Sequence, residues 1–167
     1  MPFDAAAYLN RIEWRGRLEP LLGVATGLMR AHMRAIPFEN IDVLLGRGIR
    51  VDLDSVSAKL VTARRGGYCF EHATLFAAAL AQAGFAPVAH SARVVMVTPR
   101  SAAPRTHMLL SVAIDGTAYV LDPGFGGHGP LVPLPLVEQR EIREGSDIHR
   151  LVRRDGEWCS KRQSAAR

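Results

Sequence analysis

The spacing of apolar residues divides the chain near residue 86 into a helical half and a strand-rich half. In the first half apolar residues recur every three or four positions, which is typical of helices that pack one face against a core. This spacing predicts a helix over residues 21–33, a short helix over 54–61 capped at its start by residues 54 and 55, and a strong helix that begins at residue 69 or 70 and ends at 82. Gly84 follows the last of these in the position of a C-terminal cap.

After Gly84 β-branched residues and alternation dominate, which predicts strands. The expected strands cover residues 88–98, 108–114, 117–121, 148–153 and 157–161. Asp-Gly pairs at 115–116 and 155–156 predict tight hairpin turns, and the Gly- and Pro-rich stretch 123–135 predicts a loop. Helices followed by strands indicate an α+β fold rather than an alternating βαβ fold, with a helical part over residues 1–85 and a strand part over 86–167.

Composition is that of an ordinary globular domain and excludes several classes of protein. Of 167 residues, 48% are apolar and 22% are charged, so the chain can bury a core and is not disordered throughout. The longest mainly apolar stretch, residues 21–29, is too short to cross a bilayer, and residues 1–4 do not resemble a secretory signal. Two cysteines do not form a disulfide framework, so we expect a cytoplasmic protein with no membrane partner.

The net charge of +5 leaves open an anionic partner. Basic residues concentrate in segment 150–167, where six Lys or Arg face two acidic residues and give a net charge of +4. Because only one aromatic residue lies among these arginines, we expect no nucleic-acid partner. A small anionic cofactor would suit the charge equally well, and biased genome composition would also explain the arginines.

The segment RRGGYCFE at residues 64–71 places Cys69 where a Gly-rich turn enters the strong predicted helix. A thiol at a helix N-terminus lies at the positive end of the helix dipole, which favours the reactive thiolate. The two glycines permit a tight turn and leave space beside the sulfur. The alternative is a small buried apolar cysteine, which is the common role of a free cysteine.

The predicted hairpin brings a histidine close to an aspartate. A two-residue turn at 115–116 pairs Ile114 with Thr117, and this register makes His107 and Asp122 diagonal neighbours on one face of the sheet. A carboxylate that orients an imidazole is the arrangement that a general base requires. The alternative is a core histidine beside a turn aspartate.

Four segments together resemble the arylamine N-acetyltransferases. They are PFENID at 37–42, RGGYCFE at 65–71, THML at 106–109 and DPGFG at 122–126. Their order and spacing match the family, and the resemblance runs from about residue 4 to about residue 160. It implies a helical bundle that carries the nucleophile, followed by an antiparallel β-barrel-like domain that carries the His and Asp, around a core like that of cysteine proteases.

The resemblance also implies a chemistry. Cys69 would be the nucleophile that acetyl-CoA acetylates in a ping-pong cycle, His107 the base and Asp122 its orienting carboxylate. The acetyl group would then pass to an aromatic amine or hydrazine. No metal is implied, and Cys159 is expected to be structural.

Further positions match substrate contacts of the family, although each has a plain structural explanation as core, turn or surface residue. Those assigned to the acceptor are Phe38, Thr106 and Phe125. Those assigned to the coenzyme A side are Ala103, Pro104, Gly126 and Gly127. Glu39 and Arg65 correspond to a supporting ion pair near the nucleophile.

The chain departs from the family pattern in three ways. Ala73 stands where the family usually has asparagine, and Pro123 replaces a small or branched residue after the aspartate. The α/β lid that follows the barrel in the family is not found, so we expect a C-terminally truncated member. Such a chain should have an open site and exposed apolar surface at 131–137, which a homo-oligomer would cover.

Three alternatives to the acetyltransferase remain open. A related amide synthase would use the same triad on a larger acyl donor, which an open cleft suits. A thiol hydrolase would lose the acetyl group to water because no lid protects it. A catalytically weakened remnant would survive as a binding or oligomerising module, although its three triad residues are intact.

Overall fold

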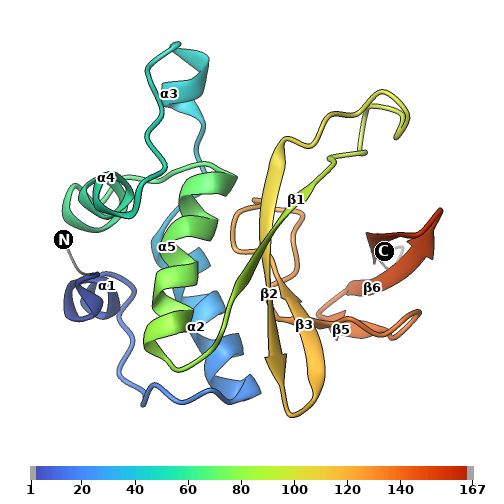
Figure 1. The fold of residues 1–167 in the computed structure, drawn as a ribbon, viewed down its shortest axis with the longest axis horizontal. Coiled ribbons are helices and arrows are strands. Elements are labelled where there is room, and N and C mark those ends of the chain that lie inside the picture. Colours follow the sequence, from blue (N-terminus) through green and yellow to red (C-terminus); the bar gives the residue numbers. More distant parts are fainter. Residues whose placement is uncertain (1–2, 165–167) are drawn as a thin grey trace.

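The computed structural model describes residues 3–164. The first two residues and residues 165–167, which include Arg167 of the basic C-terminal segment, lie outside the described residues. The helices occupy the first half of the chain and the strands the second half, so the predicted α+β order is confirmed (Figure 1).

The helical half contains every predicted helix and two short ones that the pattern did not predict, α1 and α3. The helices are α1 (Ala5–Arg11), α2 (Leu22–Ala35), α3 (Ile41–Leu44), α4 (Leu53–Ser57) and α5 (Cys69–Gln82), and a π-helical turn, η1 (Ala58–Thr62), continues α4. The predicted cap of the short helix was wrong, because the Asp52 carboxylate accepts the Ser55 N–H at 3.0 Å and α4 begins at Leu53. Gly84 follows α5 with φ of +86°, as a C-terminal capping glycine requires.

The strands form two antiparallel sheets and do not close into a barrel. One sheet has the order β1 (Val88–Ala92), β2 (His107–Ile114), β3 (Thr117–Leu121) and β4 (Leu134–Pro135). The other has the order β5 (Ile142–Glu144), β6 (Asp147–Arg154) and β7 (Glu157–Ser164).

The strands differ from the prediction in several places: β5 was not predicted, and β7 ends at Ser164 rather than at residue 161. The strand expected over 88–98 ends at Ala92, and its apolar continuation is exposed, with Val97 94% accessible. Prolines at 99 and 104 supply no backbone N–H for pairing in the connection to β2. The loop expected over 123–135 ends in β4, which pairs Leu134 with Val120.

One hydrophobic core joins the two halves of the molecule. Helix α5 lies next to α2 and packs against β1 and β2 of the four-stranded sheet (Figure 1), and its Phe76 and Leu80 are fully buried. Leu110 of β2 and Leu121 of β3 belong to the same buried cluster. The helix that begins at Cys69 is therefore packed directly against the strands that carry His107 and precede Asp122.

The β2–β3 hairpin has the register that its turn predicts. Ile114 pairs with Thr117 and Leu110 with Leu121. Asp115 and Gly116 both have positive φ, 48° and 76°, which is the conformation of a two-residue hairpin turn that follows the twist of the strands.

The surface expected to be apolar over residues 131–137 is only partly exposed. Leu131 and Val137 are 47% and 43% accessible, whereas Leu134 is 2% accessible because β4 packs on β3. The apolar surface here consists of separate residues at the two ends of the segment.

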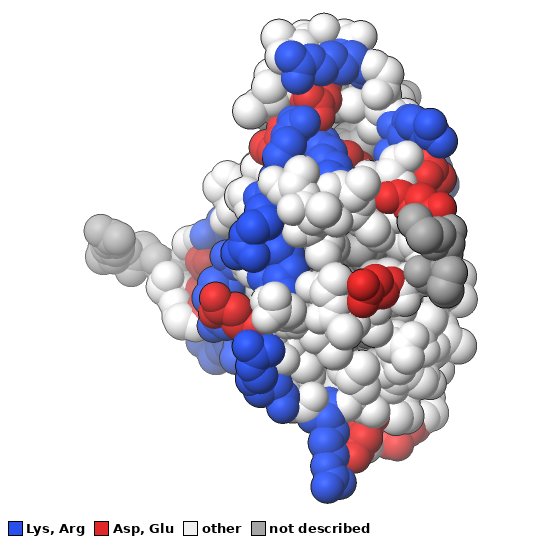
Figure 2. All heavy atoms as spheres, turned by 90° about the vertical axis from the view of Figure 1, so that its left-hand side faces the viewer, with Lys and Arg blue, Asp and Glu red and all other residues white. Residues whose placement is uncertain are grey.

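Basic residues on the face that carries α1, α3 and α4 lie among acidic ones (Figure 2). Asp42 is 3.0 Å from the Lys59 ammonium and 3.1 Å from the Arg47 guanidinium, and Arg50 is 3.1 Å from Asp52. These charges on the face are therefore paired with one another.

We expect the Gly116→Ala substitution to lower the free energy of unfolding by about 1 kcal/mol, because alanine resists the positive φ of this turn. Urea denaturation monitored by circular dichroism measures the effect. Gly48→Ala is the matched control, since Gly48 also has open space around it but no positive φ. Equal stabilities of the two variants would contradict this account of the turn.

Candidate active site

Cys69 is the first residue of α5, and two glycines allow the chain to pass closely around it. A Cβ on Gly66 would lie 2.3 Å from the Pro37 carbonyl oxygen. A Cβ on Gly124, in the loop after β3, would lie 2.8 Å from Cys69 Cα. Side chains at these positions would push the surrounding backbone apart, so the close packing at the thiol depends on glycine.

The first turn of α5 is capped by a buried carboxylate. Glu71 is 3% accessible and accepts the Tyr68 N–H at 3.0 Å. The N-terminal end of the helix and its dipole therefore point at Cys69, which is 7% accessible. The Cys69 thiol donates a hydrogen bond to the Thr106 carbonyl oxygen, with Sγ 3.6 Å from it.

His107 lies between Asp122 and Cys69. Its Nε2 is 2.8 Å from Asp122 Oδ2, and both residues are buried. Because Asp122 engages Nε2, the other ring nitrogen, Nδ1, is left for the thiol. The structure thus brings together the cysteine, histidine and aspartate that the sequence placed on three separate elements.

The surroundings of His107 favour its positive charge. Burial alone would lower the pKa of His107, but its interactions with Asp122 and Cys69 outweigh burial and raise the pKa to about 9. The imidazole is therefore protonated near neutral pH and faces the sulfur. A protonated imidazole beside a cysteine stabilises the thiolate, which is the reactive form of the nucleophile.

The ion pair between Glu39 and Arg65 is present, with 3.0 Å between oxygen and nitrogen. It belongs to a larger cluster that the sequence did not reveal, centred on Lys59 in η1. The Lys59 ammonium lies 2.9 Å from Glu71, 3.0 Å from Asp42 and 3.7 Å from Glu39. Burial opposes its charge, but hydrogen bonds to Glu71 and Asp42 raise the pKa of Lys59.

This cluster links the cap of α5 to the segment before α3. The hydrogen bond from Lys59, together with one from Arg65, lowers the pKa of Asp42 to about 2, so the carboxylate stays charged. The only sequence signal was that Lys59 is one of two lysines in a chain with 19 arginines. No rule of sequence spacing links Lys59 to Glu39 and Asp42, which precede it, or to Glu71, which follows it.

An open cavity of about 570 Å³ borders the loop after β3, and its wall includes Pro123, the residue after Asp122. Its lining combines apolar residues with two arginines of α2: Arg30, Met33, Arg34, Ile36, Phe38, Pro123, Gly126, Gly127 and Leu131. Phe125 is not among them; its ring stands edge-on to the His107 imidazole, with 5.2 Å between centroids and 88° between planes. Of the predicted acceptor residues, Phe38 therefore lines the cavity, while Phe125 and the Thr106 backbone contact the triad.

The residues predicted on the coenzyme A side divide into two places. Gly126 and Gly127 line the open cavity. Ala103 and Pro104 lie on the connection between β1 and β2, and the Ala103 carbonyl accepts a hydrogen bond from Arg93. Among residues 3–164, no hydrogen bond or ion pair joins these two residues to the Gly-rich loop.

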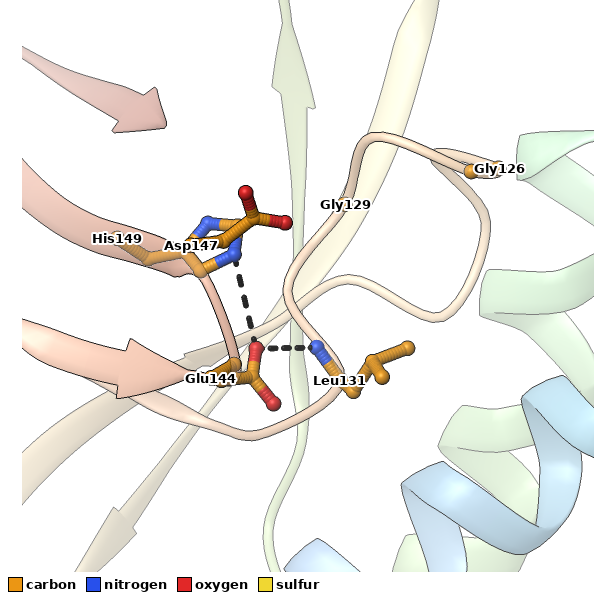
Figure 3. Close-up of a pocket in the computed structure, with 7 residues that line it drawn as sticks. Gly126, Gly129, Leu131, Glu144, Asp147 and His149 are labelled. Atoms are coloured by element: carbon orange, nitrogen blue, oxygen red, sulfur yellow. Dashed lines mark hydrogen bonds and ion pairs between the residues drawn. The ribbon is translucent and has the colours of Figure 1, made fainter. Parts of the chain in front are cut away.

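A second, smaller cavity of about 120 Å³ lies on the other side of the Gly-rich loop (Figure 3). Its wall includes Glu144, Asp147 and His149. Glu144 Oε2 accepts the Leu131 N–H at 2.8 Å and lies 3.6 Å from His149 Nε2. Two carboxylates make this cavity unfavourable for a phosphate group, whereas the larger cavity carries Arg30 and Arg34.

Three further observations concern the part of the chain that the structure describes. No group of three or more His, Cys, Asp or Glu residues in it is arranged to hold a metal ion. None of its helices is long and apolar enough to span a bilayer. Cys69 and Cys159 are both free thiols.

Comparison with known proteins agrees with these features. The family model for N-acetyltransferases matches residues 22–167. The chain is 44% identical over 145 residues to the arylamine N-acetyltransferase of Mycobacterium tuberculosis, covering 81% of this chain and 50% of the relative. It is 38% identical over 151 residues to that of Escherichia coli, covering 90% of this chain and 54% of the relative.

Solved structures give the same result. The Nocardia farcinica arylamine N-acetyltransferase superposes with a TM-score of 0.87 at 43% identity, covering 96% of this chain and 58% of the other. The Mycobacterium marinum arylamine N-acetyltransferase in complex with CoA superposes with a TM-score of 0.89 at 35% identity, covering 95% and 60%. The chain spans about half the length of the curated relatives it matches. By sequence and by fold, it belongs to the arylamine N-acetyltransferase family.

Proposed function

We propose that this chain moves an acetyl group from acetyl-CoA to an aromatic amine or hydrazine through an acetylated Cys69. The observation that carries the proposal is His107, which is held by Asp122 at 2.8 Å and lies close enough to Cys69, at the start of α5, for the cysteine to raise its pKa. The acceptor class comes from the names of the relatives, and the donor from the M. marinum relative solved with CoA.

In the first half of the cycle, the Cys69 thiolate attacks the carbonyl carbon of the acetyl thioester. The new S–C bond forms as the bond to the coenzyme A sulfur breaks, and the His107 imidazolium gives its proton to the departing thiolate. Asp122 holds the imidazole in place by its 2.8 Å contact throughout. The products are acetyl-Cys69, free coenzyme A and a neutral imidazole.

In the second half, the amine nitrogen attacks the carbonyl carbon of acetyl-Cys69. Neutral His107 takes the proton that the nitrogen loses, and Cys69 departs as the thiolate. The imidazolium and thiolate pair is then restored, so one histidine serves as acid in the first half and base in the second.

The open cavity is the proposed site for both substrates in turn. Phe38 offers its face and edge to an aryl ring at the cavity wall, where it is 45% accessible. Arg30 and Arg34 provide positive charge for the anionic donor, and Gly126 and Gly127 allow it to approach the backbone. Of the positions predicted on the coenzyme A side, Ala103 and Pro104 remain proposals without a link to this cavity.

We place the protein in a reducing compartment such as the cytoplasm, because a free nucleophilic thiol works only while reduced. The expected homo-oligomer remains a prediction, with the exposed Leu131 and Val137 at its interface. A monomer in size-exclusion chromatography with light scattering would contradict it.

The proposal predicts that acetyl-CoA adds one acetyl group to Cys69 and that an aromatic amine then removes it. Intact mass and peptide mapping measure both steps. Cys69→Ala should abolish labelling and turnover, whereas Cys159→Ala should retain both, since Cys159 lies on β7 away from the triad.

Other outcomes of this experiment separate the alternatives. Labelling by long acyl thioesters alone would favour an amide synthase. Coenzyme A release that is independent of amine would favour a hydrolase. Equal and slow alkylation of Cys69 and Cys159 by iodoacetamide, without any acyl labelling, would favour an inactive remnant and overturn the proposal.

Because the pKa of His107 is about 9 in the folded protein and about 6.5 in an unfolded chain, its protonation stabilises the fold. This stabilisation should be complete below pH ~6.5 and lost as the pH rises through about 9. The difference in unfolding free energy between the protein and His107→Gln should therefore shrink by on the order of 3 kcal/mol between about pH 6 and about pH 10.

Denaturant titrations across this pH range measure the difference. Asp122→Asn is the matched control, because it keeps the shape of the side chain but removes the charge that raises the pKa of His107. When Asp122→Asn is combined with His107→Gln, the difference in unfolding free energy caused by His107→Gln should hardly change with pH. If that difference stays constant with pH when Asp122 is present, the charged state assigned to His107 is contradicted.

A further inference from the structure

Three buried polar side chains outside the triad form a continuous chain of hydrogen bonds through the helical half. Tyr8 Oη lies 2.9 Å from His32 Nδ1, and His32 Nε2 lies 2.8 Å from His72 Nδ1. The three residues come from α1, α2 and α5, and each is at most 1% accessible. Burying three polar groups is unfavourable unless every one is paired. The hydrogen-bond partner of His72, at the end of this chain of hydrogen bonds, therefore decides how the protons are arranged.

A carbonyl oxygen at that end fixes the direction of the chain. His72 Nε2 lies 3.3 Å from the Pro37 carbonyl oxygen, which can only accept, so Nε2 is the protonated nitrogen. His72 Nδ1 must then accept from His32 Nε2–H, and His32 Nδ1 accepts from the Tyr8 hydroxyl. Each ring carries one proton, and every donor in the chain has an acceptor.

The electrostatics agree with two neutral rings. Burial, with the positive charges of neighbouring groups, lowers the pKa of His32 well below its usual value. Burial also lowers the pKa of His72, against the opposing effect of hydrogen bonds to the Pro37 and Gly67 backbone. Neither ring takes up a second proton near neutral pH, so the direction of the chain is maintained.

The carbonyl group that ends this chain of hydrogen bonds belongs to the backbone segment that carries Phe38. The Gly67 N–H donates to the Pro37 carbonyl at 3.2 Å, and the Glu39 N–H donates to the Gly67 carbonyl at 2.8 Å. Phe38 lies between these two bonds, and its ring is parallel to that of His72, with 6.4 Å between centroids and 13° between planes. His72 thus holds Phe38 through the backbone before it and through its ring.

His72 and Cys69 share α5, so the cysteine is held by the helix itself and by its cap. The segment between α2 and α3 belongs to no helix; its backbone pairs with Gly67 through the isolated bridge at Phe38, and the ion pairs of Glu39 hold the residue after Phe38 rather than Phe38 itself. Loss of the hydrogen bond from His72 would therefore change the position of Phe38, which forms part of the wall of the open cavity.

We infer that His72, held in one tautomer by His32 and Tyr8, is a positioning residue that sets Phe38 for binding of the aromatic acceptor. This inference rests on the proposed function, which makes Phe38 an acceptor contact. It assigns a role to a buried histidine that takes no part in the proton transfers.

The test compares His72→Leu, which removes both bonds at similar volume, with Arg11→Met. Arg11 is also buried and donates to a backbone carbonyl, that of Leu60 at 3.1 Å, but it is not part of the chain to Phe38. Binding of 4-methoxyaniline is followed by NMR titration, and melting temperature by circular dichroism. Both variants should have a lower melting temperature than the unaltered chain. Only His72→Leu should weaken amine binding, by about fivefold, which corresponds to the loss of one hydrogen bond.

A second measurement needs no variant. Long-range ¹H–¹⁵N correlation spectra report the tautomer of each histidine, and both His32 and His72 should carry the proton on Nε2. An Nδ1 proton on His72 would overturn the inference, as would equal amine affinity in His72→Leu and the unaltered chain. Failure of acetyl-CoA to label Cys69 in the unaltered chain would instead count against the proposed function.

Discussion

The 2.8 Å contact between His107 and Asp122 is the interaction on which the site depends. It exists because the two-residue turn at Asp115 and Gly116 sets one register for β2 and β3. A slip of one residue would move every side chain of a strand to the opposite face, and the imidazole would lose its carboxylate. The chemistry at the thiol is therefore determined by backbone geometry at the far end of the hairpin.

The helical half supplies the other partner through a different kind of constraint. Cys69 is placed by the start of α5, and that start is fixed by Glu71, which in turn is paired with Lys59. The core then locks α5 against β2, so that no flexible element lies between thiol and imidazole. Helix α5 and the β2–β3 hairpin, each positioned by its own local contacts, thus meet at the site.

Sequence reasoning succeeded where a rule of short range applied. The turn at 115–116 predicted the register, and apolar spacing with Gly84 predicted α5 from its first residue to its last. It failed where the outcome depends on contacts between distant segments. The strand expected after residue 92 was wrong because this segment pairs with no strand among the described residues and leaves Val97 exposed, and the sequence did not predict that the strands divide into two sheets. Lys59, and the pairing of His72 with His32, could not be predicted because their partners lie in other helices.

The glycines of the loop after β3 differ in what they allow. A Cβ at Gly124 would strike the backbone at Cys69, whereas Gly127 has open space around it and borders both the basic cavity and the acidic one. Residue 124 therefore has no room for a larger side chain, while a side chain at residue 127 would alter the shape of both cavities without touching Cys69. Within three residues, the loop combines a position that only glycine can fill with one that has room for a side chain.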